Sequence, residues 1–300
     1  MFLIVIGLSL FETVSSVDNA IINAEVLSTM SPRARGWFLT WGMLIAVFVV
    51  RGLLPFFIIW IFNTKLNALQ IFSATWSSNP LVFNSVNQSA PVLLMAGGVF
   101  LIFLFLHWFI LENKKFNLSK IEKFLSVKGV LFYSTMSAVL LAISLVAFKE
   151  GNIMSFGALV GAGLFFITQG FKHNADKQEK KLLGGVKSDL SKFIFLEIID
   201  STFSLDGVLG AFAFTLSVPL ILIGNGLGAL FVRQLTVGNI ARIKKYIYLK
   251  NGAMYSIFVL GVIMLLHSFG VLVPEYVSPL MTFIIIGFFF WKSVEVLKAR

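Results

Sequence analysis

The chain has 300 residues, of which 58% are hydrophobic and only 13% are charged, and it carries a formal net charge of +10. Soluble domains are typically about 45–50% apolar and about 25% charged, so this composition excludes an ordinary soluble fold and makes lipid the main solvent. The sequence has no cysteine, which excludes disulfides, thiolate metal sites and cysteine nucleophiles.

Apolar runs of about 20 residues, the length of a helix that crosses a bilayer, recur along the whole chain. They predict an all-α fold, a polytopic bundle of about nine transmembrane helices. The first run lacks a basic start and contains Glu12 and Asp18, so we interpret it as a retained span and not as a signal peptide. The expected spans lie near residues 2–28, 36–62, 91–112, 129–148, 152–171, 193–216, 218–236, 252–272 and 276–292.

The basic residues lie in alternate connections between these spans. Twenty Lys and Arg residues occupy the segments after the first, third, fifth and seventh spans and the C-terminal tail. The opposite segments hold only Lys65 and Lys149, and the basic connection after the fifth span begins at Lys172. Because basic residues collect on the cytoplasmic side, we predict an N-terminus outside and a cytoplasmic C-terminus. This topology accounts for the positive charge, so nucleic acid is not an expected partner.

An internal repeat relates the first span to the sixth and continues downstream in the same chain order. Inverted repeats are a recurrent architecture of secondary transporters, and the odd fifth span would turn the second copy over in the membrane. We therefore divide the chain into a first repeat of four spans at 1–150, a linker helix with a basic cytoplasmic loop at 151–192, and a second repeat at 193–300. The aligned pairs are Glu12 with Asp200, Ser16 with Ser204, Asp18 with Asp206, Arg51 with Arg233 and His107 with His267.

Acidic side chains occur at depths where lipid would surround them. At 1.5 Å per residue, Glu12 and Asp18 lie about 17 and about 26 Å from the first residue, and Asp206 lies about 20 Å along its span. Inserting a central Asp costs about 2.5 to 3.5 kcal/mol, so these acids are expected to face a polar cavity or one another. Ligand or proton binding is the favoured role, and a structural polar network is the alternative. Glu197 could instead lie at the membrane interface, near the cytoplasmic start of its span.

Glu12 and Asp18 do not share a face of a regular helix, because six residues turn about 600°. Either Asp18 belongs to an adjoining wall or the helix loosens at Ser15 and Ser16, as transporter helices often do at their sites. Clustered carboxylate, amide and hydroxyl oxygens suit Mn²⁺, Ca²⁺ or Mg²⁺, whereas Zn²⁺ or Cu⁺ would call for cysteine or clustered histidine. A manganese-like ion is the preferred ligand.

Two arginines and two histidines also lie within the apolar runs. Arg51 lies about 22 Å into the second span, where it would either pair with an acid of the first span or serve a structural role. Arg233 lies where its long side chain could reach water. A lone histidine in an apolar run more often bonds a neighbouring helix, so we leave His107 and His267 out of the site.

The residues from Glu12 to Ala20 and the run Phe203-Ser204-Leu205-Asp206-Gly207 resemble the paired acidic motifs of the TerC family. The resemblance covers most of the chain and is closest to that family's uncharacterised branch of unknown function, within the LysE-type exporter superfamily. It implies manganese efflux, with tellurium resistance as the historical association. In the wider family the second motif usually ends Asp-Asn, so Gly207 removes one candidate ligand. The implied metal ligands are Glu12, Asp18, Asn19, Asp200 and Asp206, with Ser16, Ser204, Glu197, Arg51 and Arg233 in support.

The expected function is export of a hard divalent cation, preferably Mn²⁺, by alternating access of two inverted halves around paired carboxylates. Proton exchange is one candidate driving force, because protons and cations compete for the same oxygens. We expect a transporter of a bacterial inner membrane, not an enzyme, with lipid and the metal ion as its partners and no permanently bound cofactor. The alternatives are export of a small organic solute, an intramembrane enzyme, or an accessory factor for membrane assembly.

Overall fold

The computed structural model describes residues 1–42, 44–62, 67, 70, 80–112, 129–183, 188–234 and 245–298. Every regular element in this part of the chain is a helix, and none of these residues lies in a strand. Several of the helices are apolar and long enough to cross a membrane. The prediction of an all-α membrane bundle, made from composition, is confirmed at this level.

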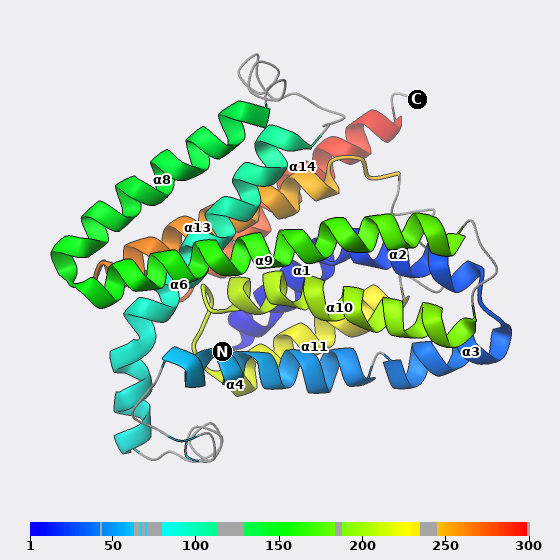
Figure 1. Cartoon of the computed structure of the whole chain (residues 1–300), viewed down its shortest axis with the longest axis horizontal. Coiled ribbons are helices and arrows are strands. Elements are labelled where there is room, and N and C mark those ends of the chain that lie inside the picture. Colours follow the sequence, from blue (N-terminus) through cyan, green and yellow to red (C-terminus); the bar gives the residue numbers. More distant parts are fainter. Residues whose placement is uncertain are drawn as a thin grey trace.

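The helices follow the order of the predicted spans. The first half contains α1 (Phe2–Ser15), α2 (Val17–Ser28), α3 (Pro32–Trp37), the π-helical turns η1 (Phe38–Gly42) and η2 (Ile45–Val50), α4 (Arg51–Phe62), α6 (Pro80–Leu111) and α8 (Gly129–Glu150). The second half contains α9 (Asn152–Leu183), α10 (Asp189–Ala211), α11 (Val218–Gln234), α13 (Leu249–Ser268) and α14 (Val277–Lys298). Figure 1 shows these helices along the chain, from α1 in blue to α14 in red.

Five helices in the described ranges contain a segment that meets the length and apolarity of a membrane span. A sixth crossing results if α1 and α2, which meet at a bend of 53°, are one broken span. Helix α11 and the segment Gly52–Ile61 are apolar but shorter, and α10 carries four acids within its length. The five segments are Ser89–Leu111, Leu131–Glu150, Asn152–Asn174, Leu249–Ser268 and Val277–Lys298. By length and composition, five of the described helices, or six crossings if α1 and α2 are one span, are suited to cross a membrane. The remaining predicted spans correspond to shorter or more polar helices.

Helices α6 and α13 form the centre of the bundle. They pack together where Gly98 and Gly261 meet, since a Cβ on either glycine would lie 3.0 to 3.2 Å from the carbonyl oxygen of the other. Small residues let membrane helices approach to backbone contact, which replaces the hydrophobic driving force that lipid does not supply. The surrounding core of α6 is fully buried at Met95, Phe100 and Leu101. This pair is the framework on which the polar helices are placed.

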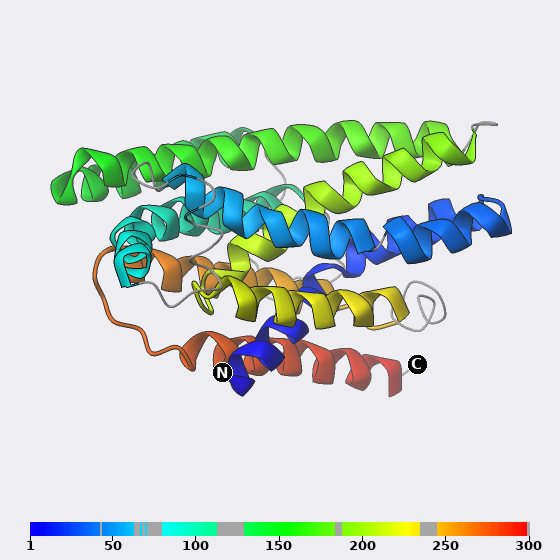
Figure 2. The same ribbon diagram turned by 90° about the horizontal axis from the view of Figure 1, so that it is seen from below.

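Helix α9 packs on one side of α6 through glycines. A Cβ at Gly161 would overlap the carbonyl oxygen of Ala96 and lie 2.9 Å from its carbonyl carbon, and a Cβ at Gly157 would lie 2.9 Å from the Val92 carbonyl oxygen. Figure 2 shows α9, in green, along one face of the molecule and α14, in red, along the opposite face. Helix α9, which the sequence predicted as a linker between the repeats, therefore packs within the bundle.

The acidic helices cross between the two halves. Helix α1 packs against α11 and α14, while α10 packs against α4, α9 and α2. Ser9 of α1 donates its hydroxyl to the Gly224 carbonyl of α11 at 2.9 Å, and a Cβ at Gly224 would lie 2.5 Å from the Cβ of Leu8. These contacts bring residues that are about 200 positions apart in the sequence into one polar region.

Candidate functional site

The first acidic helix is interrupted at Ser16. Helix α1 ends at Ser15, α2 begins at Val17, and Ser16 has φ −87° and ψ 4°. The Ser16 hydroxyl donates to Glu12 Oε1 at 2.6 Å, and its backbone N–H donates to the Glu12 carbonyl at 3.1 Å. Of the two alternatives that helical geometry allows, the structure has the interrupted helix. Glu12 and Asp18 therefore lie on separate helices, and the Asp18 side chain is outside the described part of the chain.

Glu12 lies in a slot formed by two glycines of the second half. Its side chain is 1% exposed. A Cβ at Gly207 of α10 would lie 2.5 Å from Glu12 Oε2, and a Cβ at Gly228 of α11 would lie 2.6 Å from the Glu12 Cβ. Any larger residue at either position would have to displace the glutamate. In this structure Gly207 provides the space for a carboxylate from the other half of the chain.

Asp200 of α10 is the centre of a buried amide cluster. Asn19 donates its Nδ2 group to Asp200 Oδ1, and Asn23 donates Nδ2 to the same oxygen at 3.1 Å. All three residues are at most 6% exposed. The Oδ1 atoms of Asn19 and Asn23 are buried and have no hydrogen-bond partner among the described residues. Because an unsatisfied buried acceptor costs about 1 to 3 kcal/mol, the cluster presents two amide oxygens that a ligand would satisfy.

Asp206 of α10 forms an ion pair with Lys172 of α9. Lys172 Nζ lies 2.5 Å from Asp206 Oδ2, and the two side chains are 14% and 12% exposed. Asp206 Oδ1 is buried and has no hydrogen-bond partner within the described ranges. The charge pattern assigned Lys172 to a solvent-exposed connection, and the structure corrects this: the lysine lies within α9, and its side chain packs against an acid of the site.

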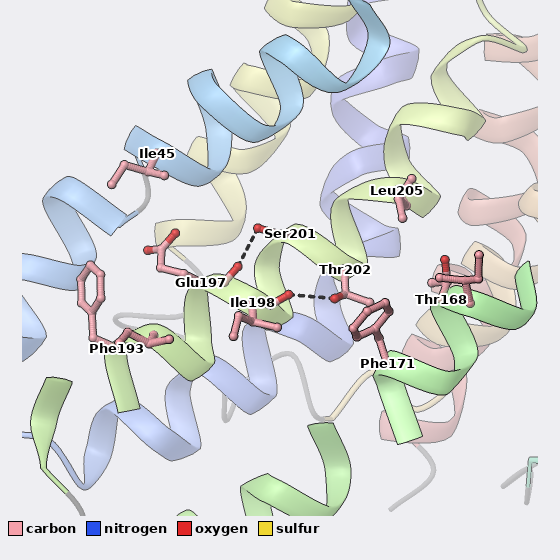
Figure 3. Close-up of a pocket in the computed structure, with 11 residues that line it drawn as sticks. Ile45, Thr168, Phe171, Phe193, Glu197, Ile198, Ser201, Thr202 and Leu205 are labelled. Carbon is pink, nitrogen blue, oxygen red and sulfur yellow. Dashed lines mark hydrogen bonds between the residues drawn. The ribbon is translucent and has the colours of Figure 1, made fainter. Parts of the chain in front are cut away.

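Glu197 lines a cavity of about 490 Å³ between α9, α10 and η2. Both of its carboxylate oxygens are buried and lack a hydrogen-bond partner in the described part of the molecule, and a Cβ at Gly42 would overlap Oε1. Figure 3 shows Glu197 toward the end of the pocket where Ile45 and Phe193 lie. The other lining residues are Ile167, Thr168, Phe171, Ile194, Ile198, Ser201, Thr202 and Leu205. Glu197 therefore faces a mostly apolar pocket, one turn before Asp200.

Ser204 is the residue that the predicted repeat pairs with Ser16. Its hydroxyl donates to the Asp200 backbone carbonyl at 2.6 Å, which stabilises the backbone of α10. Arg233 is half-buried in the last turn of α11, and no described residue forms an ion pair with it. Arg51 begins α4, and its side chain, like that of Asp18, is outside the described part.

The two histidines have structural surroundings. The His107 ring packs edge-on against Phe132, with ring centroids 5.5 Å apart, and against Phe165 at 6.0 Å. His267 Nε2 accepts a hydrogen bond from the Val273 backbone N–H at 3.2 Å, which ties the end of α13 to the following loop.

A polar clasp joins the end of α2 to the start of α10. The Ser31 hydroxyl donates to Asp189 Oδ2 at 2.5 Å, and the ammonium of Lys192 donates to the Thr29 carbonyl at 2.8 Å. Arg35 Nε donates to the Leu27 carbonyl at 3.0 Å, so two cations face the C-terminal carbonyls of α2. Cations at a helix C-terminus are favourable because the helix dipole is negative there. The clasp holds the two acidic helices together at one end of the bundle.

The clasp is expected to depend on pH through Asp189. The hydrogen bond from Ser31, helped by the nearby charge of Lys192, holds the pKa of this exposed carboxyl below its usual value of 3.8. A lowered folded-state pKa means that the stabilisation is present above pH 4 and is lost as the pH falls through the folded pKa, below 3.8. We expect the melting temperature of the wild type to exceed that of Asp189→Asn at pH 6, and the difference to shrink as the pH is lowered below 3.8, as measured by differential scanning fluorimetry in detergent. The exposed Glu295→Gln variant is the control, and a difference that stays constant over this range would contradict the assignment.

The acids whose side chains the structure describes do not form one ligand set. Within the described ranges no three His, Cys, Asp or Glu side chains gather in a group that could hold a metal. Glu12 is bonded to Ser16, Asp200 to Asn19 and Asn23, and Asp206 to Lys172. Of the five predicted ligands, the structure brings Asp200 and Asn19 into direct contact. Glu12 reaches the backbone of α10 beside Asp206.

Two residues of the site were missed in the sequence. Asn23 lies four residues after Asn19, on the same face of a helix, so the i, i+4 spacing carried a signal for it. Lys172 carried none, because it reaches Asp206 across 34 residues of chain and between two helices. A charge count assigns a lysine near a helix end to the aqueous side.

Residues 17–300 match the model of one protein family, whose description reads "Protein of unknown function (DUF475)". The match covers all of the described helices from α2 to α14. No curated protein and no solved structure matches the chain significantly.

Proposed function

This chain belongs to the DUF475 family, and from that premise and the buried acids of α10 we propose that it is a membrane transporter that exports a hard divalent cation, preferably Mn²⁺. The observation that carries the proposal is the Asp200 cluster, in which one carboxylate and two asparagines are buried together between α2 and α10. Buried acids within membrane helices are costly and typically mark ion pathways.

The cluster can exchange amide donors for a cation by a small movement. Asn19 and Asn23 each donate their Nδ2 group to Asp200 Oδ1. The side-chain oxygens of the two asparagines have no hydrogen-bond partner among the described residues. Turning each amide by about 180° exchanges its oxygen and nitrogen, because the two ends of the group are nearly equal in size. A cation would then meet one carboxylate and two amide oxygens, which are ligands suited to Mn²⁺, Ca²⁺ and Mg²⁺.

The contacts of the acids support the proposed inverted repeat. In the alignment, Glu12 corresponds to Asp200 and Asn19 corresponds to Gly207. Glu12 lies against Gly207, and Asp200 bonds Asn19, so exchanging the two copies exchanges these two contacts. The packing of α1 on α11 corresponds in the same way to the packing of α10 on α4, while α6 and α13 pack on each other. These paired contacts are what two inverted halves around a shared site would produce, and we retain nine spans within this proposal.

Transport would proceed by alternating access of the two halves. The clasp between Ser31 and Asp189 joins the acidic helices at one end, so opening there would require it to break. We propose that protons compete with the cation for the carboxylates, which bind the ion when ionised and release it when protonated. The chain would carry out no covalent chemistry and hold no permanent cofactor. A relation to the TerC family and to LysE-type exporters, and with it tellurium resistance, is a prediction that agrees with this function.

The proposed orientation follows from charge alone. The N-terminus would lie outside and the C-terminus in the cytoplasm, because the basic segments alternate along the chain. The proposed location is a bacterial inner membrane.

The test is Mn²⁺ flux in proteoliposomes that contain the full chain and a metal-sensitive dye. We expect an imposed pH gradient to drive Mn²⁺ movement, and Asp18→Asn and Asp206→Asn to lose most of it, since each removes a carboxylate from the proposed path. Undiminished flux in either variant would remove that residue from the site. A wild type that moves none of Mn²⁺, Ca²⁺ or Mg²⁺ would overturn the cation transporter.

A second candidate is export of a small organic solute, which the Glu197 pocket favours. Its volume of about 490 Å³ exceeds what a bare ion needs, and its wall is mostly apolar with one buried carboxylate. Such a pocket fits an apolar molecule with a cationic group. Competition of hydrophobic ammonium ions with Mn²⁺ flux, lost in Glu197→Gln, would favour this reading over the first.

A further inference from the structure

We propose that Lys172 is a tethered cation that occupies Asp206 when no substrate ion is bound and that competes with the ion for this carboxylate. The inference rests on the proposed function and adds to it a regulator of the same site. The ammonium of Lys172 and the substrate cation are alternative partners of the Asp206 carboxylate.

The geometry of the pair carries the inference. Lys172 Nζ lies 2.5 Å from Asp206 Oδ2, and only 14% and 12% of the two side chains are exposed. The second oxygen, Asp206 Oδ1, is buried and has no hydrogen-bond partner within the described ranges. Lys172 therefore bonds one oxygen of the carboxylate, Oδ2. The other oxygen, Oδ1, is the one that an incoming cation would bind.

The lysine comes from a helix outside the two predicted repeats. Helix α9 lies between them in the sequence and packs against α6, α8 and α10. Asp206 corresponds by alignment to Asp18, and the segment 151–192 that carries Lys172 occurs once in the chain. The lysine that pairs with Asp206 therefore comes from a segment that has no counterpart in the proposed repeat.

Energetics favour a dynamic role over a purely structural one. A buried ion pair gives little net stability, because desolvation of both groups offsets their attraction, whereas an unpaired buried carboxylate is strongly unfavourable. Lysine is a compact charge on a flexible four-carbon stem, so it can leave the carboxylate without movement of the backbone. When the ion departs, the ammonium returns, and Asp206 is neutralised in the empty carrier. The empty protein can then reorient without moving an uncompensated buried charge.

The first test measures Mn²⁺ affinity by isothermal titration with the full chain in detergent. Removing the competitor in Lys172→Gln is expected to tighten Mn²⁺ binding about tenfold and to slow release in the flux assay. Lys172→Arg keeps the charge and is expected to bind Mn²⁺ no more tightly than the wild type. In Asp206→Asn, the further change Lys172→Gln is expected to have no additional effect on affinity. A structural role alone predicts a lower melting temperature for Lys172→Gln with unchanged affinity, and that result would overturn the proposal.

The second test needs no variant at Lys172 and no assumption about transport. An amine-reactive reagent, followed by mass spectrometry, reports how often Lys172 is away from its carboxylate. We expect slow modification in the wild type without metal, several-fold faster modification in Asp206→Asn, and acceleration of the wild type by Mn²⁺. Equal rates in the metal-free wild type and Asp206→Asn would overturn the occupancy of Asp206 by the lysine.

The outcomes separate this inference from the proposed function. If wild-type Mn²⁺ binding is lost in Asp200→Asn but unchanged in Lys172→Gln, the lysine proposal fails and the cation site stands. If neither the wild type nor Lys172→Gln binds Mn²⁺, Ca²⁺ or Mg²⁺, the proposed function fails and the competitor with it.

Discussion

Asp200→Asn is expected to weaken Mn²⁺ binding about 100-fold, equivalent to about 2.8 kcal/mol, and to abolish flux at micromolar ion. The change keeps the shape of the side chain and removes the charge that two buried amides now share. A neutral amide oxygen is a poorer ligand for a hard cation than a carboxylate. Isothermal titration and proteoliposome flux measure the two effects separately.

The same measurements on neighbouring positions give the controls for Asp200. Asn19→Ala and Asn23→Ala each remove one neutral oxygen and are expected to have smaller effects than removal of the charge. The exposed Glu295→Gln on α14 removes a charge outside the site and should leave binding and flux unchanged. If folded Asp200→Asn bound and transported Mn²⁺ like the wild type, the cluster would not be the ion site.

Gly161→Ala is expected to lower the stability of the bundle by forcing α9 away from α6. The added methyl would overlap the Ala96 carbonyl oxygen and lie 3.0 Å from the Ala96 Cα, and backbone cannot move aside as a side chain can. Overpacking of this kind costs about 1 to 3 kcal/mol, and separation of α9 from α6 would add to it. The readout is the free energy of unfolding, measured by denaturant titration in mixed micelles.

Gly163, two residues further along the same helix, provides the matched control. A Cβ there would meet no atom within 4 Å, so Gly163→Ala should be neutral, or stabilising by up to about 1 kcal/mol through the higher helix propensity of alanine. Equal stability of the two variants would mean that α9 does not pack on α6 through Gly161. If α9 moves away from α6 in Gly161→Ala, we also expect the Lys172–Asp206 pair to be disturbed, because Lys172 lies about three turns further along α9.

The identification of the acids as a buried polar set needed only the sequence. Apolar runs about as long as the bilayer is thick predict helices, and Glu12, Asp200 and Asp206 within those runs had to be buried from lipid. The structure buries all three. The interruption of the first helix at Ser16 was one of two outcomes that helical geometry allowed. In each case the signal is local, because periodicity and composition act within one helix.

The partners of those acids were decided by the tertiary structure. Three contacts depend on how four helices cross. Asn23 shares Asp200 with Asn19, Gly207 makes room for Glu12, and Lys172 neutralises Asp206. The charge count assigned Lys172 to water, since it describes the side of the membrane and not the neighbours of a side chain. The sequence alone predicts a membrane bundle and acids within its spans, because the length and composition of each apolar run carry that signal locally. The pairing of one carboxylate with one amide or ammonium is set by the packing of helices far apart in the chain, which no local pattern encodes.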